Sequence, residues 1–484
     1  SNLRAALADL QQDTSAGGYQ ALAAFHGLPA MCPSPDAADR YACCVHGMPT
    51  FLLYHRLITM QFENAMLRHG AKLGVPYWDW TQSMRHLPDF LTDAHSNPFH
   101  HAQIAFENTV TKRSPQPELF EQLSDHLNSH ILRKILLAFE LKDFCQFTVQ
   151  MEGVHNDIHY LIGGTEKFSM THLHYSAFDP IFYLVHSNLD RLFALWQSLQ
   201  KYRGLPYNSA PCIDQFYMRD PIEPFNFGIE FNPDPVTRKH SKPADVFDWE
   251  HSFDYTYDRL STYGYSLEEL QAKVDEHRRE KDRILAAFML HGIGTSARVD
   301  FSVCIADKNG DEDCSHPAGW FTLLGGSKEM NWYYDRPYLY DITDTLDSMG
   351  LKYGDYFWIQ SKVTAHNGTS LDGHTTFPQP FQVYVPKGGD HTVLTVNWHP
   401  KNTFPSFFTF SGDTRLRFAV YHSESQPIKR MLHPQNVFKC NLPKYSYVDV
   451  KAGEEITLHK GFYMYTTGDE KQCNNGFKLF FKKV

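Results

Sequence analysis

The stretch MEGVHNDIHYLIGG, residues 151–164, decides the fold together with DPIFYLVHSNLDRLFALW, residues 179–196. In the first stretch, His155 and His159 are four residues apart, so an α-helix places both imidazoles on one face. The glycine pair at 163–164 predicts the end of this helix, because glycine readily takes the left-handed conformation common at helix C-termini.

The second stretch predicts a helix with a histidine on its apolar face. Asp179 can cap the free N–H groups, Pro180 suits the first helical position, and His186 lies among apolar residues. A single histidine there is more often a core residue than a ligand, and the pair His126 and His130 is expected to be a solvated helix face. The combination nevertheless indicates a three-histidine site, which suits copper, zinc or iron.

A second set of three histidines precedes these helices. His26 ends a short amphipathic helix, and His46 lies on the loop before a long helix predicted from Pro49 to about residue 70. His55 falls in the second turn of that helix. Each could be a core or capping residue, but two three-histidine sets, each followed by an apolar helix, favour a dinuclear metal centre.

Length and charge narrow the classes of protein. A chain of 484 residues is expected to form about two to four domains. The net charge of -10 gives no sign of nucleic-acid binding or of a basic membrane patch. No apolar run is long enough for a membrane span, and no signal peptide opens the chain, which we expect to be a mature form or a fragment.

The nine cysteines suggest an oxidising environment. An odd count leaves one over after pairing. The simplest pairs are Cys32–Cys43, Cys145–Cys212, Cys304–Cys314 and Cys440–Cys473, which would imply an extracellular protein. Cys44 remains, two residues before His46, where a free thiol beside copper would be open to oxidation and should be protected.

The motifs FHG, CP, RYACCVHGMP, HNDIH and DPIFYLVHSNLDR together resemble type 3 copper proteins. More narrowly, the chain resembles a functional unit of a molluscan haemocyanin, most nearly the C-terminal unit of the keyhole-limpet type. The resemblance implies a secreted haemolymph protein that joins other units in a large homo-oligomer. It also implies dioxygen held as peroxide between two copper ions. His26, His46 and His55 would bind one copper; His155, His159 and His186 would bind the other.

The resemblance further implies a thioether between Cys44 and His46, which accounts for the ninth cysteine. Reversible binding needs a dry, apolar lining, and we expect Phe182 and Trp196 near the metals, although both could be plain core residues. Phenol-oxidising relatives also have an asparagine at the position of Asn156, so a catechol oxidase or tyrosinase activity that is latent until the cleft opens is the main alternative. Many tyrosinases have a second histidine where this chain has Ser187. A dizinc hydrolase or a purely structural protein fits less well.

The expected fold is multidomain. An α-helical copper domain with a four-helix-bundle site spans residues 1–292, and its last, charged helix runs to about residue 288. Short alternating strands then predict a β-sandwich over residues 293–389. The resemblance implies that Leu324, with Leu323 as the alternative, closes the copper cleft. Asn367 begins a glycosylation sequon. Residues 390–484 resemble a cupredoxin-like domain, expected to hold no copper and to serve assembly.

Overall fold

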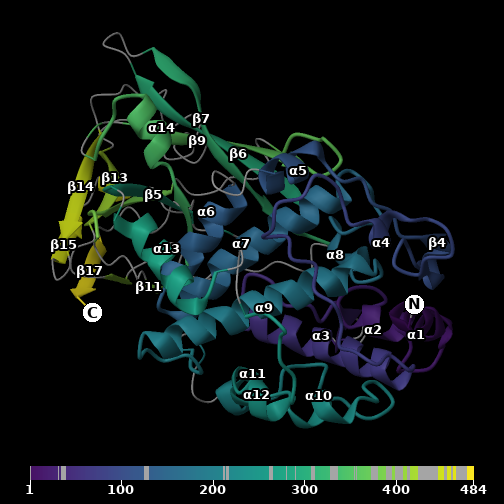
Figure 1. Cartoon of the computed structure of the whole chain (residues 1–484). Coiled ribbons are helices and arrows are strands. Elements are labelled where there is room, and N and C mark those ends of the chain that lie inside the picture. Colours follow the sequence, from purple (N-terminus) through teal and green to yellow (C-terminus); the bar gives the residue numbers. More distant parts are fainter. Residues whose placement is uncertain are drawn as a thin grey trace.

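The structure is a computed structural model that describes residues 2–388 with short gaps and, beyond residue 388, the backbone of seven strands. The residues outside the description before 388 are 31, 34–39, 125–129, 211–212, 214–216, 261–264, 280, 289, 291, 307–310, 327–335, 354, 356 and 372–379. Helices occupy the first part of the chain, and the strands of the later part gather at the other end (Figure 1).

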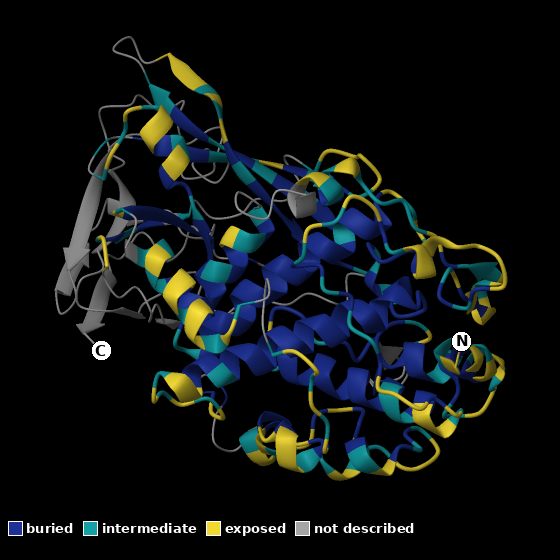
Figure 2. Ribbon diagram, in the orientation of Figure 1, coloured by how far each residue is buried: buried dark blue, intermediate teal, exposed yellow. Residues whose placement is uncertain are grey.

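Four long helices form the centre of the helical part: α3 (Phe51–Arg68), α6 (His130–Glu140), α7 (Phe144–Gly163) and α9 (Ile181–Tyr202). α3 packs against α9 and α7, and α6 packs against α7. Every residue of α9 from Ile181 to Gln197 is buried, and Figure 2 shows these helices as the most buried elements. A helix buried on all sides belongs to the interior of a large protein.

The predicted ends of these helices are confirmed. α7 stops at Gly163, and Gly164 follows with a φ of +58°. α9 starts directly after Pro180, and the Asp179 carboxylate accepts a hydrogen bond from the Ile181 N–H at 3.0 Å. α3 begins two residues after Pro49 and ends at Arg68. Local capping chemistry therefore places the helices that carry four of the six histidines.

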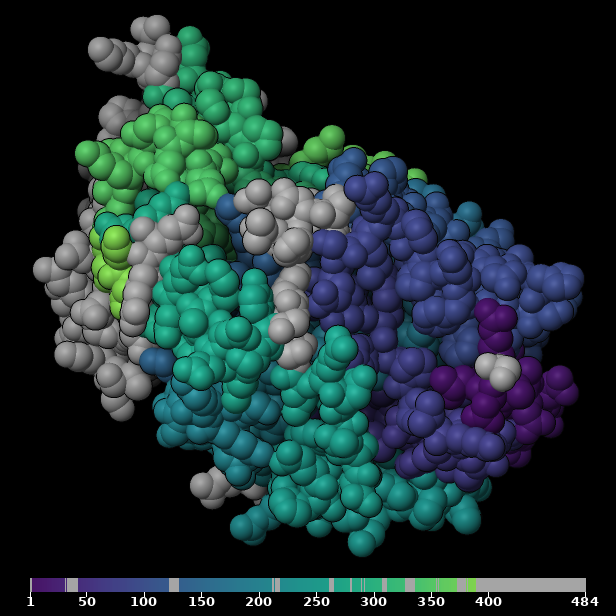
Figure 3. Space-filling view, in the orientation of Figure 1, coloured from purple at the N-terminus to yellow at the C-terminus, as the bar shows by residue number. Residues whose placement is uncertain are grey.

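Shorter elements surround this centre. They are α1 (Asn2–Gln12), α2 (Tyr19–Ala24), α4 (Asp89–Thr92), η1 (Ala105–Glu107), α5 (Pro117–Ser124), α8 (Leu173–Ser176), η2 (Tyr217–Arg219), α10 (Pro235–Lys239), α11 (Pro243–Phe247), α12 (Trp249–Ser252) and α13 (Leu267–Arg279). Two small ribbons join β1 (Cys32–Pro33) to β2 (Arg40–Tyr41) and β3 (Gln103–Ile104) to β4 (Thr109–Val110). In the space-filling view, α13 forms part of the surface beside the β-rich part (Figure 3).

The β-rich part packs two sheets face to face. One sheet has the order β7-β6-β9, made of β6 (Ala297–Ala306), β7 (Glu312–Leu323) and β9 (Trp358–Ala365), all antiparallel. The other contains β5 (Arg283–Phe288), β8 (Tyr338–Asp341) and β10 (Phe381–Val385), with α14 (Thr343–Ser348) after β8. Phe288 of the second sheet contacts Phe301 and Phe321 of the first. β7 and β8 also pack against α7, which joins the sandwich to the helical part.

The expected end of the helical part was wrong. α13 stops at Arg279, and β5 begins at Arg283 as a member of the sheet with β8 and β10. A strand of the sandwich thus precedes the boundary expected at residue 292. The reason is that RILAAF is a short apolar run, which fits a buried strand and the end of a buried helix equally well.

Beyond residue 388 the described backbone comprises β11 (Thr395–Asn397), β12 (Phe407–Phe410), β13 (Arg415–His422), β14 (Tyr445–Lys451), β15 (Glu455–Leu458), β16 (Phe462–Met464) and β17 (Phe477–Lys483). β13 pairs with β10, so the sheet continues across residue 390. A four-stranded sheet has the order β11-β12-β17-β15, with β12 and β17 parallel. Within the described residues, no helix is both long and apolar enough to cross a membrane.

Candidate metal centre

The helical part brings six histidines together in its interior. His55 lies on α3, His155 and His159 on α7, and His186 on α9, while His26 follows α2 and His46 lies on the loop before α3. None of the six is more than 2% exposed. The two sets that the sequence suggested therefore lie at one place.

The rings of each set face one another. In the first set, the ring centres are 5.6 Å apart for His26–His46, 5.5 Å for His26–His55 and 5.2 Å for His46–His55. In the second set, they are 4.2 Å apart for His155–His159, 4.9 Å for His155–His186 and 5.1 Å for His159–His186. The His55 and His186 rings stack at 4.9 Å, so the two sets are adjacent.

One nitrogen of each ring is engaged with protein on its outer side. Five Nδ1 atoms lie 2.7–3.2 Å from an oxygen: His26 to the Leu173 carbonyl, His55 to Phe51, His159 to Met170, His186 to Phe182, and His155 to the Asn156 side chain. Because these oxygens only accept, each Nδ1 carries the hydrogen and Nε2 keeps a lone pair. This is the tautomer that a metal ligand needs.

The inner nitrogens lack protein partners of the usual kind. The Nε2 atoms of His26, His55 and His159 are buried without a hydrogen-bond partner among the described residues. The Nε2 atoms of His155 and His186 lie 2.9 Å from each other. Buried polar atoms are normally paired, so such a cluster points to a missing ligand. The donor set, all imidazole, fits copper, and zinc or iron less specifically.

Burial keeps all six rings neutral. It lowers the pKa of His55 to about 3 and that of His159 to about 4. Burial, reinforced by the neighbouring imidazoles, also lowers the pKa values of His26, His46, His155 and His186 well below the usual 6.5. A neutral imidazole offers its lone pair to a metal, whereas a protonated one repels it.

His46 is held from two sides. The Cys44 Sγ lies 2.7 Å from the His46 Nδ1, which is closer than an ordinary sulfur–nitrogen contact. On the other side, both carboxylate oxygens of Glu152 accept the Gly47 N–H, at 2.8 and 2.9 Å. Glu152 is 1% exposed and lies on α7, three residues before His155. Glu152 was not predicted from the sequence, because no local pattern links it to a loop 105 residues earlier.

Of the two aromatic residues expected near the metals, the structure brings only Phe182 to the histidines. Its ring centre lies 4.7 Å from that of His26, 5.8 Å from His159 and 3.8 Å from His186. Trp196 stacks on Phe147 at 4.6 Å and donates to the Leu141 carbonyl at 2.8 Å. Ten residues of helix place it about 15 Å along α9 from His186, so the expectation for Trp196 was wrong.

The end of β7 lies over the ligand-bearing helix. The Thr322 N–H and hydroxyl both donate to the Asp157 carboxylate, at 3.0 and 2.9 Å. Asp157 also binds the Lys134 ammonium at 2.5 Å. Leu324, 3% exposed, packs with the helical core, whereas Leu323 packs inside the sandwich. Of these two leucines, Leu324 is therefore the one directed toward the helical part.

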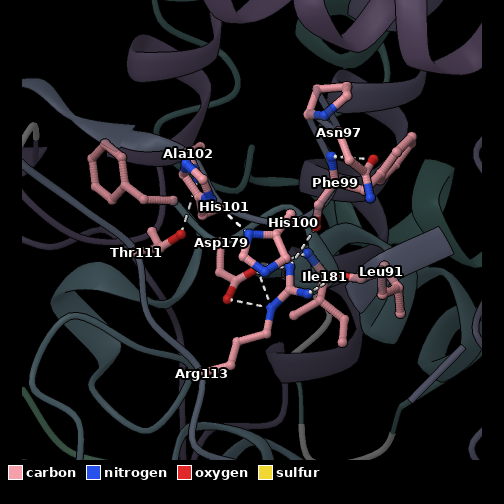
Figure 4. A network of polar contacts seen from close by, with 12 residues as sticks. Leu91, Asn97, Phe99, His100, His101, Ala102, Thr111, Arg113, Asp179 and Ile181 are labelled. Carbon is pink, nitrogen blue, oxygen red and sulfur yellow. Dashed lines mark hydrogen bonds and ion pairs between the residues drawn. The ribbon is translucent and has the colours of Figure 1, made fainter. Parts of the chain in front are cut away.

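A buried ion pair secures the start of α9. The Arg113 guanidinium binds the Asp179 carboxylate at 2.5–3.1 Å and donates to the Leu91 and Phe99 carbonyls at 2.9 and 2.6 Å (Figure 4). The same carboxylate caps α9 at Ile181. Asp179 was expected as a cap, but its pairing with Arg113 was not, because the two residues are 66 positions apart.

The cysteines and the glycosylation sequon were also singled out from the sequence. Disulfides join Cys32 to Cys43 and Cys304 to Cys314. Cys145 is disulfide-bonded, but Cys212, Cys440 and Cys473 fall outside the described residues. Cys44 is the free cysteine of the described part. Asn367 is exposed in a turn after β9.

His130 corrects another expectation. It is half-buried rather than solvated, and its Nδ1 pairs with the Tyr340 hydroxyl of β8 at 2.6 Å. It also lines a cavity of about 150 Å³ between α6 and β8. Burial, with Lys134 and Arg133 nearby, lowers its pKa to about 4. His126 lies outside the described residues. Helical spacing alone could not show that the sandwich would cover this face.

Comparisons with known proteins agree with this architecture. Residues 16–199 match the common central domain of tyrosinase, and residues 278–386 match the haemocyanin β-sandwich. Hemocyanin type 2 unit e of Rapana venosa is 44% identical over 393 residues, which cover 79% of this chain and 93% of that protein. The structure of deoxygenated hemocyanin from Rapana thomasiana superposes with a TM-score of 0.75 at 43% identity, covering 80% of this chain and 95% of that one.

A longer relative shows the scale of the match. Hemocyanin 2 of Megathura crenulata is 46% identical over 400 residues, which cover 81% of this chain but only 12% of that protein. The chain thus spans about an eighth of that relative's length.

Proposed function

Because this chain belongs to the molluscan haemocyanins, we propose that it binds dioxygen reversibly at two copper ions. His26, His46 and His55 would hold one ion, and His155, His159 and His186 the other. Copper held by these residues would supply the reversible electron transfer that dioxygen binding requires. Everything else at the centre is done by the protein, which orients the imidazoles, excludes water and limits access.

The observation that carries the proposal is the arrangement of the six imidazoles. Five outer nitrogens bind oxygen acceptors, and the inner nitrogens of His26, His55 and His159 are buried without hydrogen-bond partners among the described residues. A merely structural cluster would leave these three polar atoms unpaired, each costing about 1–3 kcal/mol. Two metal ions, each with three imidazoles, would satisfy them. A zinc hydrolase usually adds a carboxylate ligand, and both sets are all-histidine.

We also propose a thioether between Cys44 Sγ and His46 Cε1, the ring carbon between the two nitrogens; it would form with loss of the thiol hydrogen and the ring hydrogen to dioxygen, the two-electron oxidant that the proposed function supplies. The 2.7 Å approach of Sγ to Nδ1 supports it, because a sulfur bonded to the neighbouring carbon would lie at about such a distance. The bond would fix the ring on a loop that has no regular hydrogen-bonded structure. It would also protect a buried thiol that lies beside copper.

Water and large substrates are kept out from two directions. Phe182 covers three of the imidazoles, and a dry site favours release of unreacted dioxygen over proton-driven side reactions. We propose that Leu324 closes the entrance on the side of the sandwich. The Asn156 Oδ1 lies 3.0 Å from the His155 Nδ1 and orients this ligand. Because phenol-oxidising relatives also have an asparagine at this position, a latent catechol oxidase activity is the second candidate function.

The wider setting follows from the relatives. Since the chain spans 12% of Hemocyanin 2 of Megathura crenulata, we propose that it works beside other units in a large oligomer. We further propose an extracellular, haemolymph location, with Cys145–Cys212 and Cys440–Cys473 as further disulfides and exposed Asn367 as a glycosylation site. A cupredoxin-like domain over residues 390–484, without copper, remains our interpretation of the last part.

The test is copper content together with a near-ultraviolet spectrum under air, under argon and again under air. We expect two coppers per chain and an absorption band that disappears without oxygen and returns with it. Two coppers without a reversible band would contradict oxygen transport, and absence of copper from protein exposed to copper(I) would contradict the metal centre. Added catechol then measures the latent oxidase activity on the same sample.

A further inference from the structure

The segment that follows β7 is anchored by one buried serine. The Gly325 N–H, next to Leu324, donates to the Ser296 hydroxyl at 2.9 Å. Ser296 is completely buried, directly before β6, and its hydroxyl donates to the Thr171 carbonyl. A hydroxyl has one hydrogen and two lone pairs, so Ser296 can make both bonds at once. It therefore links the tip of the sandwich to a loop of the helical part.

That loop orients one ligand from each histidine set. The Met170 carbonyl holds the His159 Nδ1 at 2.9 Å, and the Leu173 carbonyl holds the His26 Nδ1 at 3.2 Å. Thr171 lies between these two carbonyls. The Leu173 N–H also donates to the Gly325 carbonyl at 3.3 Å. We call residues 322–325 the lid segment. The same four residues, 170–173, thus bind the lid segment on one side and two imidazoles on the other.

The other end of the lid segment is tied to α7. Thr322 donates twice to Asp157, which lies between His155 and His159 in sequence. Gly325 itself fits closely, because a Cβ there would lie 2.4–2.6 Å from the Thr295 backbone. Residues 322–325 therefore cannot move without changing contacts of the elements that orient the ligands.

We propose that Ser296 is a positioning residue that determines specificity: its hydroxyl keeps Leu324 closed over the metal centre and couples this closure to the orientation of His26 and His159. The consequence is a chain that carries dioxygen and oxidises phenols poorly. The proposal rests on the proposed function, and it adds a residue outside the metal ligands that decides between the two chemistries.

The test compares Ser296→Ala with Thr343→Val in the full chain. Thr343 is a matched control, since its buried hydroxyl also accepts a backbone N–H, from Ile284 at 2.9 Å, but in the sandwich away from the lid. We expect Ser296→Ala to raise kcat/KM for catechol by about tenfold, as for a lost hydrogen bond. We also expect a shifted oxygen affinity at unchanged copper content. Thr343→Val should change neither.

Two further variants keep the proposal falsifiable. Ser296→Cys keeps a side chain of similar shape with a weaker hydrogen-bond donor. Its kcat/KM for catechol and its oxygen affinity should lie between those of the wild type and Ser296→Ala. This variant also provides the test if the alanine variant folds poorly. Leu324→Ala tests the lid itself. Catechol oxidation and oxygen affinity in Ser296→Ala equal to those of Thr343→Val would overturn the role of Ser296. A wild-type protein without the reversible oxygen band would instead overturn the proposed function.

Discussion

The two histidine sets are built in different ways. The second set takes all three ligands from α7 and α9, and the His186 Nδ1 is held by a carbonyl of its own helix, Phe182, at 2.7 Å. The first set takes one ligand from α3, one from shortly after the end of α2 and one from a loop. The helices place all three ligands of the second set, although the His159 Nδ1 also binds the Met170 carbonyl outside α7. The loop ligand His46 instead depends on side chains from elsewhere.

Those additional contacts explain how the irregular set is kept in place. Cys44 approaches the His46 ring, and Glu152 binds the following peptide. His26 is held by Leu173 and, through the preceding carbonyl, by the Tyr54 hydroxyl. The first set should therefore be the more sensitive to single side chains, while the second should be lost mainly when α7 or α9 fails to form.

The largest expected effect comes from removing the ion pair that secures α9. Arg113→Met leaves the Asp179 carboxylate buried without its cation, which costs about 3–5 kcal/mol of stability. Chains that still fold should nevertheless bind two coppers, because α9 itself orients His186. Urea unfolding and copper content measure the two effects. Loss of copper from folded protein would contradict the robustness of the helical set.

Glu152→Leu should weaken copper binding at the first set. It removes the acceptor of the Gly47 N–H, and loss of such an outer partner typically lowers metal affinity about 10–100-fold. At a copper concentration that just gives the wild type two coppers per chain, we expect about one copper per chain in this variant. Gln150→Leu is the control, since Gln150 is buried on the same helix but bonds Leu339 of β8. Equal copper loss in both variants would make Glu152 merely structural.

Cys44→Ala should have a smaller effect. Without the thioether, Glu152 still binds the Gly47 N–H next to His46. Copper affinity should therefore fall by less than about tenfold. Mass spectrometry should show the wild-type peptides of Cys44 and His46 linked and the Cys44 thiol unavailable to alkylation. A freely alkylated Cys44 in the copper-loaded wild type would contradict the crosslink.

His130→Gln tests a buried histidine that is not expected to bind copper. Its effect on the free energy of unfolding at neutral pH should be the smallest of these variants. The folded-state pKa of His130, about 4, lies below its ordinary value of 6.5, so the unfolded chain binds the extra proton between these pH values. This group therefore lowers the free energy of unfolding as pH falls, by about 1.4 kcal/mol per pH unit. His130→Gln should remove that slope and leave copper content unchanged. Urea unfolding at pH 7 and pH 5 measures it.

The sequence predicts those parts of the site that depend on local order. Helical spacing and capping residues place His55, His155, His159 and His186 on their helices, and the glycine after α7 ends it as expected. The error at Trp196 has the same origin. Periodicity indicates which face of α9 a residue occupies, but not how far along the helix axis the residue lies from the histidine cluster.

Contacts across long stretches of chain could not be predicted in this way. Glu152 meets a loop 105 residues away, Arg113 meets Asp179 over 66 residues, and Ser296 meets Thr171 over 125. Each is a common residue type in an ordinary local context. The strand β5 was missed for a related reason, since only its pairing with β8 and β10 distinguishes it from a helix end.

The sequence by itself determined the helices that carry most of the histidines, the residue types of the metal centre and the strand-rich character of the later chain. These depend on periodicity, capping and turn chemistry, which act over a few residues. Only the tertiary structure decided how the two sets meet, how His46 is held and what lies over the centre. Those features are hydrogen bonds and packing between elements distant in sequence, and no short-range pattern specifies them.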